Sequence, residues 1–286
     1  GIPVVEDGSQ AHGARIAGKM VGRYGDAAGF SCMGFKLLGT TEAGYLATPH
    51  EDVYWKAALC CQHMGRSPDP GFPAKLLPFV DSLVYSYRLS PVTAVLLTEQ
   101  LKKVDREIEG RRKNVASIRK LLEGSACISF PAYRADEKPS YYTLSINFSS
   151  EAAGVRRETF QKALAAERVE VGSYVPSPIP HWERMRTSGY AGPKTIWTKQ
   201  LAAAGADYRS QCFPGTAEKV KKSLDMDWNY LKDVPGRMAH LADVFLMVEE
   251  NLPALRDWER AQQKKTVARL TGKKTKVRPS RREVLA

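Results

Sequence analysis

The chain has 286 residues, with 43 Lys and Arg against 31 Asp and Glu, and therefore a formal charge of +12 at pH 7. Its hydrophobic content of 43% is enough to build a sizeable core, which excludes a chain that is disordered throughout. No stretch of the sequence approaches the roughly 20 apolar residues that a membrane-spanning helix needs, so we expect no membrane partner.

The excess positive charge lies at one end of the chain. Residues 260–286 hold ten basic residues and a single acid, Glu283, which gives +9 and leaves only about +3 for residues 1–259. Basic side chains bind nucleic acid by displacing counterions from its phosphates. We expect a nearly neutral body followed by a basic, disordered tail at 260–286. Nucleic-acid binding by this tail is the minor alternative, not the main function.

The five cysteines stand at positions 32, 60, 61, 127 and 212 and form no CxxC pair or other zinc spacing. Their number is odd and no signal peptide is visible, so reduced thiols, a cytoplasmic location and no metal site are expected. The sequence begins without Met on an apolar run, which predicts the later part of a longer protein.

The first ninety residues alternate short apolar strands with helical segments, which predicts an α/β arrangement. A buried parallel strand is expected at 2–6, just before Asp7, and a hairpin-like excursion is expected around Gly18. The other elements expected in this part are strands at 27–31 and 44–48, a helix at 51–64 and a loop at 65–82.

The clearest helix signal begins at Ser90, a helix-capping residue, with Pro91 at the first helical position. Its apolar pattern runs to Gly124, as one long helix or two abutting helices. Beyond Gly124 strands and helices are mixed without regular alternation. The elements expected there are strands at 128–130, 141–148 and 169–174, and helices at 158–167, 217–224 and 241–252.

Standard short motifs for nucleotide, metal and hydrolase sites are absent, but polar residues follow the small-residue strands. Lys36 lies in an apolar, glycine-containing segment, where desolvation would lower the pKa of its amine, as a Schiff-base lysine requires. A buried carboxylate opposite it, such as Asp7, would suit a protonated pyridinium nitrogen. Taken singly, these are weak signals, because a lone lysine is usually an ordinary surface residue and an Asp after a strand is usually a turn or cap residue.

Together these residues resemble one family, the DegT/DnrJ/EryC1/StrS aminotransferases, which use pyridoxal phosphate (PLP). The similarity is dense over residues 2–120 and thin from there to about 255. The segments that carry it are Val5-Glu-Asp7-Gly-Ser-Gln10-Ala-His12-Gly-Ala14, Gly25-Asp26, Phe30-Ser31, Lys36, His63 with Gly65, Tyr87-Arg88-Leu89-Ser90 and Phe213-Pro214.

The resemblance implies the PLP-transferase fold of type I, an α/β fold. Residues 1–115 would form part of the large PLP-binding domain, a three-layer α/β/α structure with a mostly parallel sheet. Residues 116–259 would form the small α+β C-terminal domain. The family also implies a homodimer whose active sites are shared between the subunits.

The resemblance also implies roles for the cofactor-binding residues. Lys36 would bind PLP covalently and act as the catalytic residue that shuttles a proton. Asp7 would pair with the pyridinium N–H, Gln10 would contact the ring, and Ser31 would donate to the phosphate. Ser86 replaces an Asn that reaches the phosphate of the neighbouring subunit.

Three further residues are candidates for the substrate site. Tyr174 stands where the family has a substrate-site His, and His181 lies nearby in the sequence. Arg88, in the Tyr-Arg segment, is a candidate for reaching the neighbouring subunit. Glu42 matches an acid of a glycine-rich family segment, and His12 lies in the matched motif with a structural role equally open.

The function implied is a PLP-dependent aminotransferase that moves an amino group from glutamate or glutamine to a keto-sugar, often nucleotide-linked, or to a cyclitol ketone. A truncated, non-catalytic member of the same fold is an alternative. Another is a PLP-dependent sugar dehydratase, in which a His typically replaces the lysine, so Lys36 argues against it.

Overall fold

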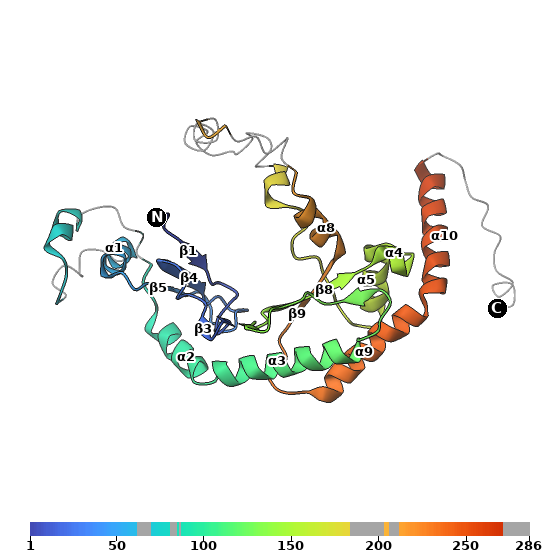
Figure 1. Ribbon diagram of the computed structural model, residues 1–286, viewed down its shortest axis with the longest axis horizontal. Helices are drawn as coiled ribbons and strands as arrows, with labels where there is room; N and C mark the ends of the chain where they lie inside the picture. Colours follow the sequence, from blue (N-terminus) through green and yellow to red (C-terminus); the bar gives the residue numbers. More distant parts are fainter. Residues whose placement is uncertain (62–69, 81–84, 86, 184–202, 206–211, 271–286) are drawn as a thin grey trace, which may run out of the picture. The chain divides into compact units, whose positions relative to one another are not determined.

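The computed structural model describes residues 1–61, 70–80, 85, 87–183, 203–205 and 212–270. Helices and sheets are mixed, as the sequence predicts (Figure 1). The chain divides into two compact units, each assembled from three segments. Unit 1 comprises Gly1–Ser117, Ala132–Leu144 and Asp227–Met238, and unit 2 comprises Ile118–Pro131, Ser145–Met226 and Ala239–Ala286.

The first sheet of unit 1 contains three strands in the order β1-β4-β5. Strand β1 (Val5–Asp7) pairs in parallel with β4 (Ala27–Ser31), and β5 (Gly44–Ala47) pairs with β4 in the antiparallel direction. The expected strands are therefore present. This sheet holds one parallel and one antiparallel pair, whereas the sheet expected for residues 1–115 was mostly parallel.

Strand β1 is more exposed than the sequence predicts. The side chains of Ile2, Val4 and Val5 are 91%, 53% and 73% exposed, although their apolar run was expected to be buried. In contrast, Ala27, Ala28 and Phe30 of β4 are buried, because β4 lies between two neighbouring strands. An apolar run shows that a strand can be buried, but not whether another element covers it.

A β-hairpin follows β1, as the sequence predicts. Its strands are β2 (Arg15–Ile16) and β3 (Lys19–Met20), and β7 (Glu137–Lys138) pairs with the other side of β2. The two turn residues, Ala17 and Gly18, have φ angles of 47° and 77°. Positive φ at both central residues is the geometry of the tight hairpin turn that follows the twist of the strands.

The helices of unit 1 begin near the expected residues, except that a short 3₁₀ helix lies within the loop expected at 65–82. They are α1 (Glu51–Cys61), the 3₁₀ helix η2 (Ala74–Phe79), α2 (Pro91–Leu101) and α3 (Val104–Leu121), whose last residues belong to unit 2. The pattern from Ser90 onward therefore forms two abutting helices, with Pro91 at the start of α2 as expected.

Two buried polar side chains of α3 hold a distant segment in unit 1. The guanidinium of Arg111 donates to the backbone carbonyls of Tyr141 and Trp228. The amide of Asn114 donates to the carbonyls of Tyr230 and Lys232 at 3.1 and 2.6 Å. Buried polar groups need such partners, so these bonds hold the segment that contains Trp228, Tyr230 and Lys232 against α3.

Unit 2 is built around a sheet in the order β6-β8-β9, with β6 (Ile128–Ser129), β8 (Thr143–Phe148) and β9 (Ser223–Asp227). Alternate residues of β8 are buried, as its sequence predicts, and Phe148 stacks on Phe160 with ring centroids 4.6 Å apart. The helices are α4 (Ser150–Ala153), α5 (Arg157–Ala166), η3 (Ile179–His181), α8 (Pro214–Lys222), α9 (Pro235–Glu250) and α10 (Leu252–Leu270).

Three expectations for unit 2 differ from the structure. Residues 169–174 do not form a strand and contribute one bridge, between Gly172 and Asp225. Helix α8 ends at Lys222, and the next residues form β9 instead of completing the predicted helix. Helix α10 includes residues 260–270, where a disordered tail was expected, and residues 261–267 of this helix are largely exposed.

Candidate functional site

The parallel pair β1 and β4 brings an acid and a hydroxyl to one edge of the sheet. Asp7 is the last residue of β1 and pairs with Gly29, two residues before Ser31 at the end of β4. The carboxyl ends of parallel strands meet at the same edge, where α/β proteins commonly bind ligands. Lys36 follows five residues after Ser31, in the loop that leads to β5.

The loop that carries Lys36 is tightly turned. The backbone N–H of Lys36 donates to the Met33 carbonyl at 2.8 Å, and the Gly39 N–H donates to the side chain of Gln100 at 2.9 Å. A Cβ atom on Gly39 would lie 2.8–2.9 Å from the carbonyl oxygens of Lys36, Gly34 and Met33. The loop therefore requires glycine at position 39, which fixes the backbone that presents Lys36.

Asp7 and Lys36 interact electrostatically. The side chain and backbone N–H of Ser9 donate to the Asp7 carboxylate, and these bonds, together with the nearby charge of Lys36, lower the pKa of Asp7. The Asp7 carboxylate is exposed, which differs from the buried carboxylate that the sequence suggested. Lys36 is half-buried, and its Nζ lies 4.6 Å from the centroid of the Tyr142 ring, within cation–π range.

His12 is the most deeply buried of the polar residues in the matched motif. Its side chain is 3% exposed, and its ring centroid lies 5.3 Å from that of Phe30 and 6.0 Å from that of Tyr45. Neither ring nitrogen has a hydrogen-bond partner among the described residues. Burial lowers the pKa of His12 to about 4, and the charge of Lys36 acts in the same direction.

Sequence reasoning missed Glu6, which organises the loop beside the strand ends. Its carboxylate accepts hydrogen bonds from the backbone N–H groups of Gly22, Tyr24 and Gly25, each at 2.7 Å. Burial acts to raise the pKa of Glu6, but these three bonds outweigh it and the pKa is lowered. The signal in the sequence was the glycine-containing run 22–25. A turn there leaves backbone N–H groups without strand partners, and these groups need an acceptor such as Glu6.

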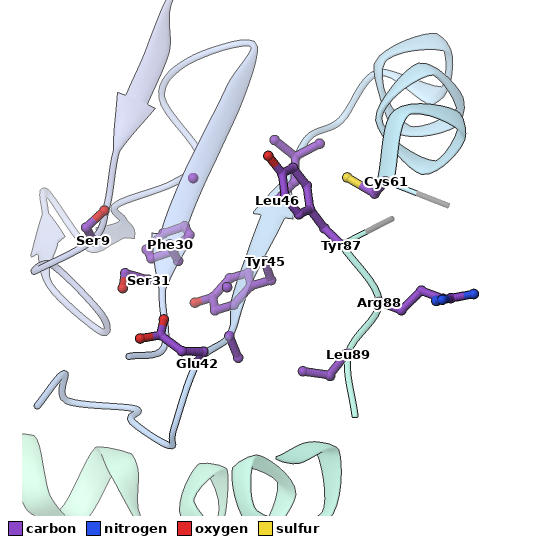
Figure 2. Close-up of a pocket in the computed structure, with 13 residues that line it drawn as sticks. Ser9, Phe30, Ser31, Glu42, Tyr45, Leu46, Cys61, Tyr87, Arg88 and Leu89 are labelled. Carbon is purple, nitrogen blue, oxygen red and sulfur yellow. The ribbon is translucent and has the colours of Figure 1, made fainter. Parts of the chain in front are cut away.

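An open cleft of about 660 Å³ lies beside β4 and β5 (Figure 2). Its wall includes Phe30 and Tyr45, whose rings stack with centroids 4.7 Å apart. Figure 2 shows the Ser31 and Glu42 side chains next to one another, whereas Arg88 points away from the two rings. The lining residues are Ser9, Gly29, Phe30, Ser31, Glu42, Ala43, Gly44, Tyr45, Leu46, Cys61, Tyr87, Arg88 and Leu89.

The remaining predicted site residues are distributed over both units. Gln10 is exposed in the loop that follows β1 in unit 1. Tyr174 and His181 belong to unit 2. The Tyr174 side chain is 60% exposed and its backbone N–H donates to Asp225, whereas the His181 ring lies 5.8 Å from that of Phe213. Ser86, like His63 and Gly65, lies outside the described residues.

Residues 1–205 match the model of the DegT/DnrJ/EryC1/StrS aminotransferase family. The chain belongs to this family. The resemblance that the sequence motifs indicate is therefore confirmed. Among curated relatives, the L-glutamine:2-deoxy-scyllo-inosose aminotransferase of Streptomyces lividus is 30% identical over 175 residues, which cover 58% of this chain and 40% of the relative. The chain spans less than half the length of this relative.

Solved structures of the family share the fold. PseC of Helicobacter pylori, an aminotransferase involved in the biosynthesis of pseudoaminic acid, matches with a TM-score of 0.70 at 16% identity, over 87% of this chain and 60% of PseC. The GDP-4-keto-6-deoxy-D-mannose-3-dehydratase of E. coli with bound hydrated PLP matches with a TM-score of 0.62 at 18% identity, over 85% of this chain and 60% of the dehydratase. The α/β fold expected from the sequence is confirmed. Within the described part of the chain, no helix is both long and apolar enough to cross a membrane.

Proposed function

We propose that this chain is part of a PLP-dependent aminotransferase that transfers the amino group of glutamine or glutamate to a cyclitol ketone or a keto-sugar. One observation carries the proposal: the parallel pair β1 and β4 brings Asp7 and Ser31 to one sheet edge, and Lys36, in the loop that follows, interacts electrostatically with Asp7. The family match supports it, and the name of the Streptomyces lividus relative supports glutamine as donor and a cyclitol ketone as acceptor.

The residues at this edge fit PLP by their chemistry. PLP, when bound, supplies a ring that accepts electrons from the substrate carbon. The Asp7 carboxylate, whose pKa lies below its ordinary value, is ionised at neutral pH and could hold a protonated ring nitrogen. Ser31 offers a hydroxyl donor for the phosphate. Lys36 offers the amine that would hold the cofactor and move a proton at the substrate carbon.

The other assignments belong to the same proposal. Gln10 would contact the cofactor ring, and Ser86 would donate to the phosphate of a neighbouring subunit in a homodimer. Tyr174 and His181 would contribute to acceptor binding, with Arg88 reaching across the subunit interface. The exposure of Tyr87 and Arg88, which precede α2, leaves them accessible for such a contact.

The decisive variant is Lys36→Ala. The protein incubated with PLP is expected to show the visible absorbance of a lysine-bound cofactor, and borohydride reduction should fix the label on the peptide that contains Lys36. Lys56→Ala is the matched control, since Lys56 is an exposed lysine of α1 paired with Asp52. Unchanged absorbance and labelling in Lys36→Ala would refute the assignment of the cofactor lysine.

A turnover assay separates the proposal from the two alternatives. Incubation with glutamine and 2-deoxy-scyllo-inosose, or with a nucleotide-linked keto-sugar, should give an aminated product detectable by mass spectrometry. Loss of a hydroxyl without amination would identify a dehydratase. A protein that binds PLP at Lys36 but aminates no ketone of either class would be the non-catalytic member.

A further inference from the structure

Helix α10 carries charge that the proposed aminotransferase does not use. Its first half is fixed within unit 2, because Leu252 is buried and Arg256 donates to the carbonyl of Ala153 at 2.9 Å. The carboxylate of Glu259, 7% exposed, accepts hydrogen bonds from Arg156 and Thr159. These contacts fix the helix axis within unit 2, so the second half projects in a defined direction.

The second half of α10 is basic, and most of residues 260–267 are exposed. Residues 260–270 include Arg260, Lys264, Lys265 and Arg269 and no acidic residue. Lys264 and Lys265 are exposed. The sequence beyond the helix continues the same charge, since no acid occurs before Glu283. Such a run of positive charge is complementary to a polyanion.

The helical register favours nucleic acid over a membrane surface. At 3.6 residues per turn, Trp258 and Lys265, seven residues apart, lie on the same face of the helix. Trp258 and Val267, nine residues apart, lie on opposite faces, and they are 43% and 58% exposed. A helix that lies in a membrane surface needs its apolar residues together on one face, which α10 lacks. An exposed aromatic on the same helix face as a lysine, about two turns away, instead matches the platforms on which unpaired bases stack.

We propose that the second half of α10 binds single-stranded nucleic acid. The ammonium groups of Lys264 and Lys265 bind backbone phosphates, and the indole of Trp258 stacks on an unpaired base. The proposal does not depend on the aminotransferase activity, since none of these residues belongs to the PLP site proposed above. Composition does not show where the charges lie, whereas the helix brings Trp258 and Lys265 to one face, about two turns apart.

The test measures binding of the full chain to fluorescein-labelled oligo-dT by fluorescence anisotropy, between about 50 and 200 mM salt. The double variant Lys264→Glu/Lys265→Glu is expected to bind at least about tenfold more weakly. Its salt slope should fall by about 1.4, because each lost phosphate contact on a single strand removes about 0.7. Trp258→Ala should weaken binding by about tenfold with an unchanged salt slope, since stacking releases no counterions.

The matched control is Lys221→Glu/Lys222→Glu, which makes the same change in net charge on the exposed end of α8. It is expected to bind within about twofold of the unchanged protein. Equal weakening by both double variants would mean that only net charge matters and would overturn the proposal. Absence of oligo-dT binding would also overturn it, as would tighter binding to phosphatidylserine vesicles than to oligo-dT at the same salt.

Discussion

Burial of His12 makes the stability of unit 1 depend on pH. The side chain is 3% exposed, and burial lowers its pKa from 6.5 to about 4. An unfolded chain binds a proton at this imidazole below about pH 6.5, whereas the folded chain does not until about pH 4. The unfolded state therefore binds more protons between these values, and the free energy of unfolding falls as the pH is lowered through that range.

The size of the effect follows from the pKa. A difference of one pKa unit corresponds to about 1.36 kcal/mol, so the full change from 6.5 to about 4 is worth about 3 kcal/mol. At pH 4.5 this titration is expected to have lowered the free energy of unfolding by about 2.5 kcal/mol. His12→Leu removes the titration. At neutral pH it loses ring contacts with Phe30 and Tyr45 but also removes two buried nitrogens, so the two effects, each about 1 kcal/mol, nearly cancel.

Urea unfolding of the unchanged protein and of His12→Leu, at about pH 7.5 and about pH 4.5, measures this directly. The two proteins should be within about 1 kcal/mol of each other at the higher pH. The variant should be the more stable by about 2.5 kcal/mol at the lower pH, because every other titration is common to both. A difference between the two proteins that does not change with pH would refute the reasoning. So would an NMR titration in which the His12 ring titrates near 6.5.

Two further substitutions test how the strand ends and the loop of unit 1 are held. Glu6→Gln should lower the free energy of unfolding by about 1–2 kcal/mol at pH 7, because an amide replaces an ionised acceptor of three backbone N–H groups. Because the pKa of Glu6 is lowered in the folded protein, its carboxylate stabilises the fold above the ordinary pKa of 4.5, and this stabilisation is lost as the pH falls through the lowered pKa. If Glu6→Gln were destabilised by the same amount in strong acid, this explanation would be wrong. Asn114→Ala should cost about 1–3 kcal/mol, since the partly buried carbonyls of Tyr230 and Lys232 lose their donor and the Val234 N–H loses its acceptor. Thermal denaturation that leaves Asn114→Ala within experimental error of the unchanged protein would show that the loop is held by other contacts.

Local sequence signals placed most elements of unit 1 correctly. The run Ala27–Ser31 forms β4 over the predicted residues, and α2 begins at Pro91 because proline fixes a helical φ and needs no N–H partner there. The Ala17–Gly18 turn follows from the same kind of local preference. These signals are reliable because the residues involved limit their own backbone angles, whatever surrounds them.

The order and spacing of the motif residues also determined the family from the sequence alone. Asp7, Ser31 and Lys36 stand at fixed intervals, and the family match over residues 1–205 confirms the assignment. The roles of the individual residues stay predictions. Their chemistry depends on which groups surround them, as the exposed Asp7 carboxylate illustrates.

Only the tertiary structure decided what covers or contacts a given residue. The apolar run before Asp7 is exposed, Glu6 collects three N–H donors from a loop sixteen to nineteen residues away, and residues 223–227 pair as β9 instead of extending a helix. Burial, hydrogen-bond partners and strand pairing are properties of residues far apart in the chain. Local sequence limits the backbone angles that a segment can adopt, but the partners that select among them are supplied by the fold.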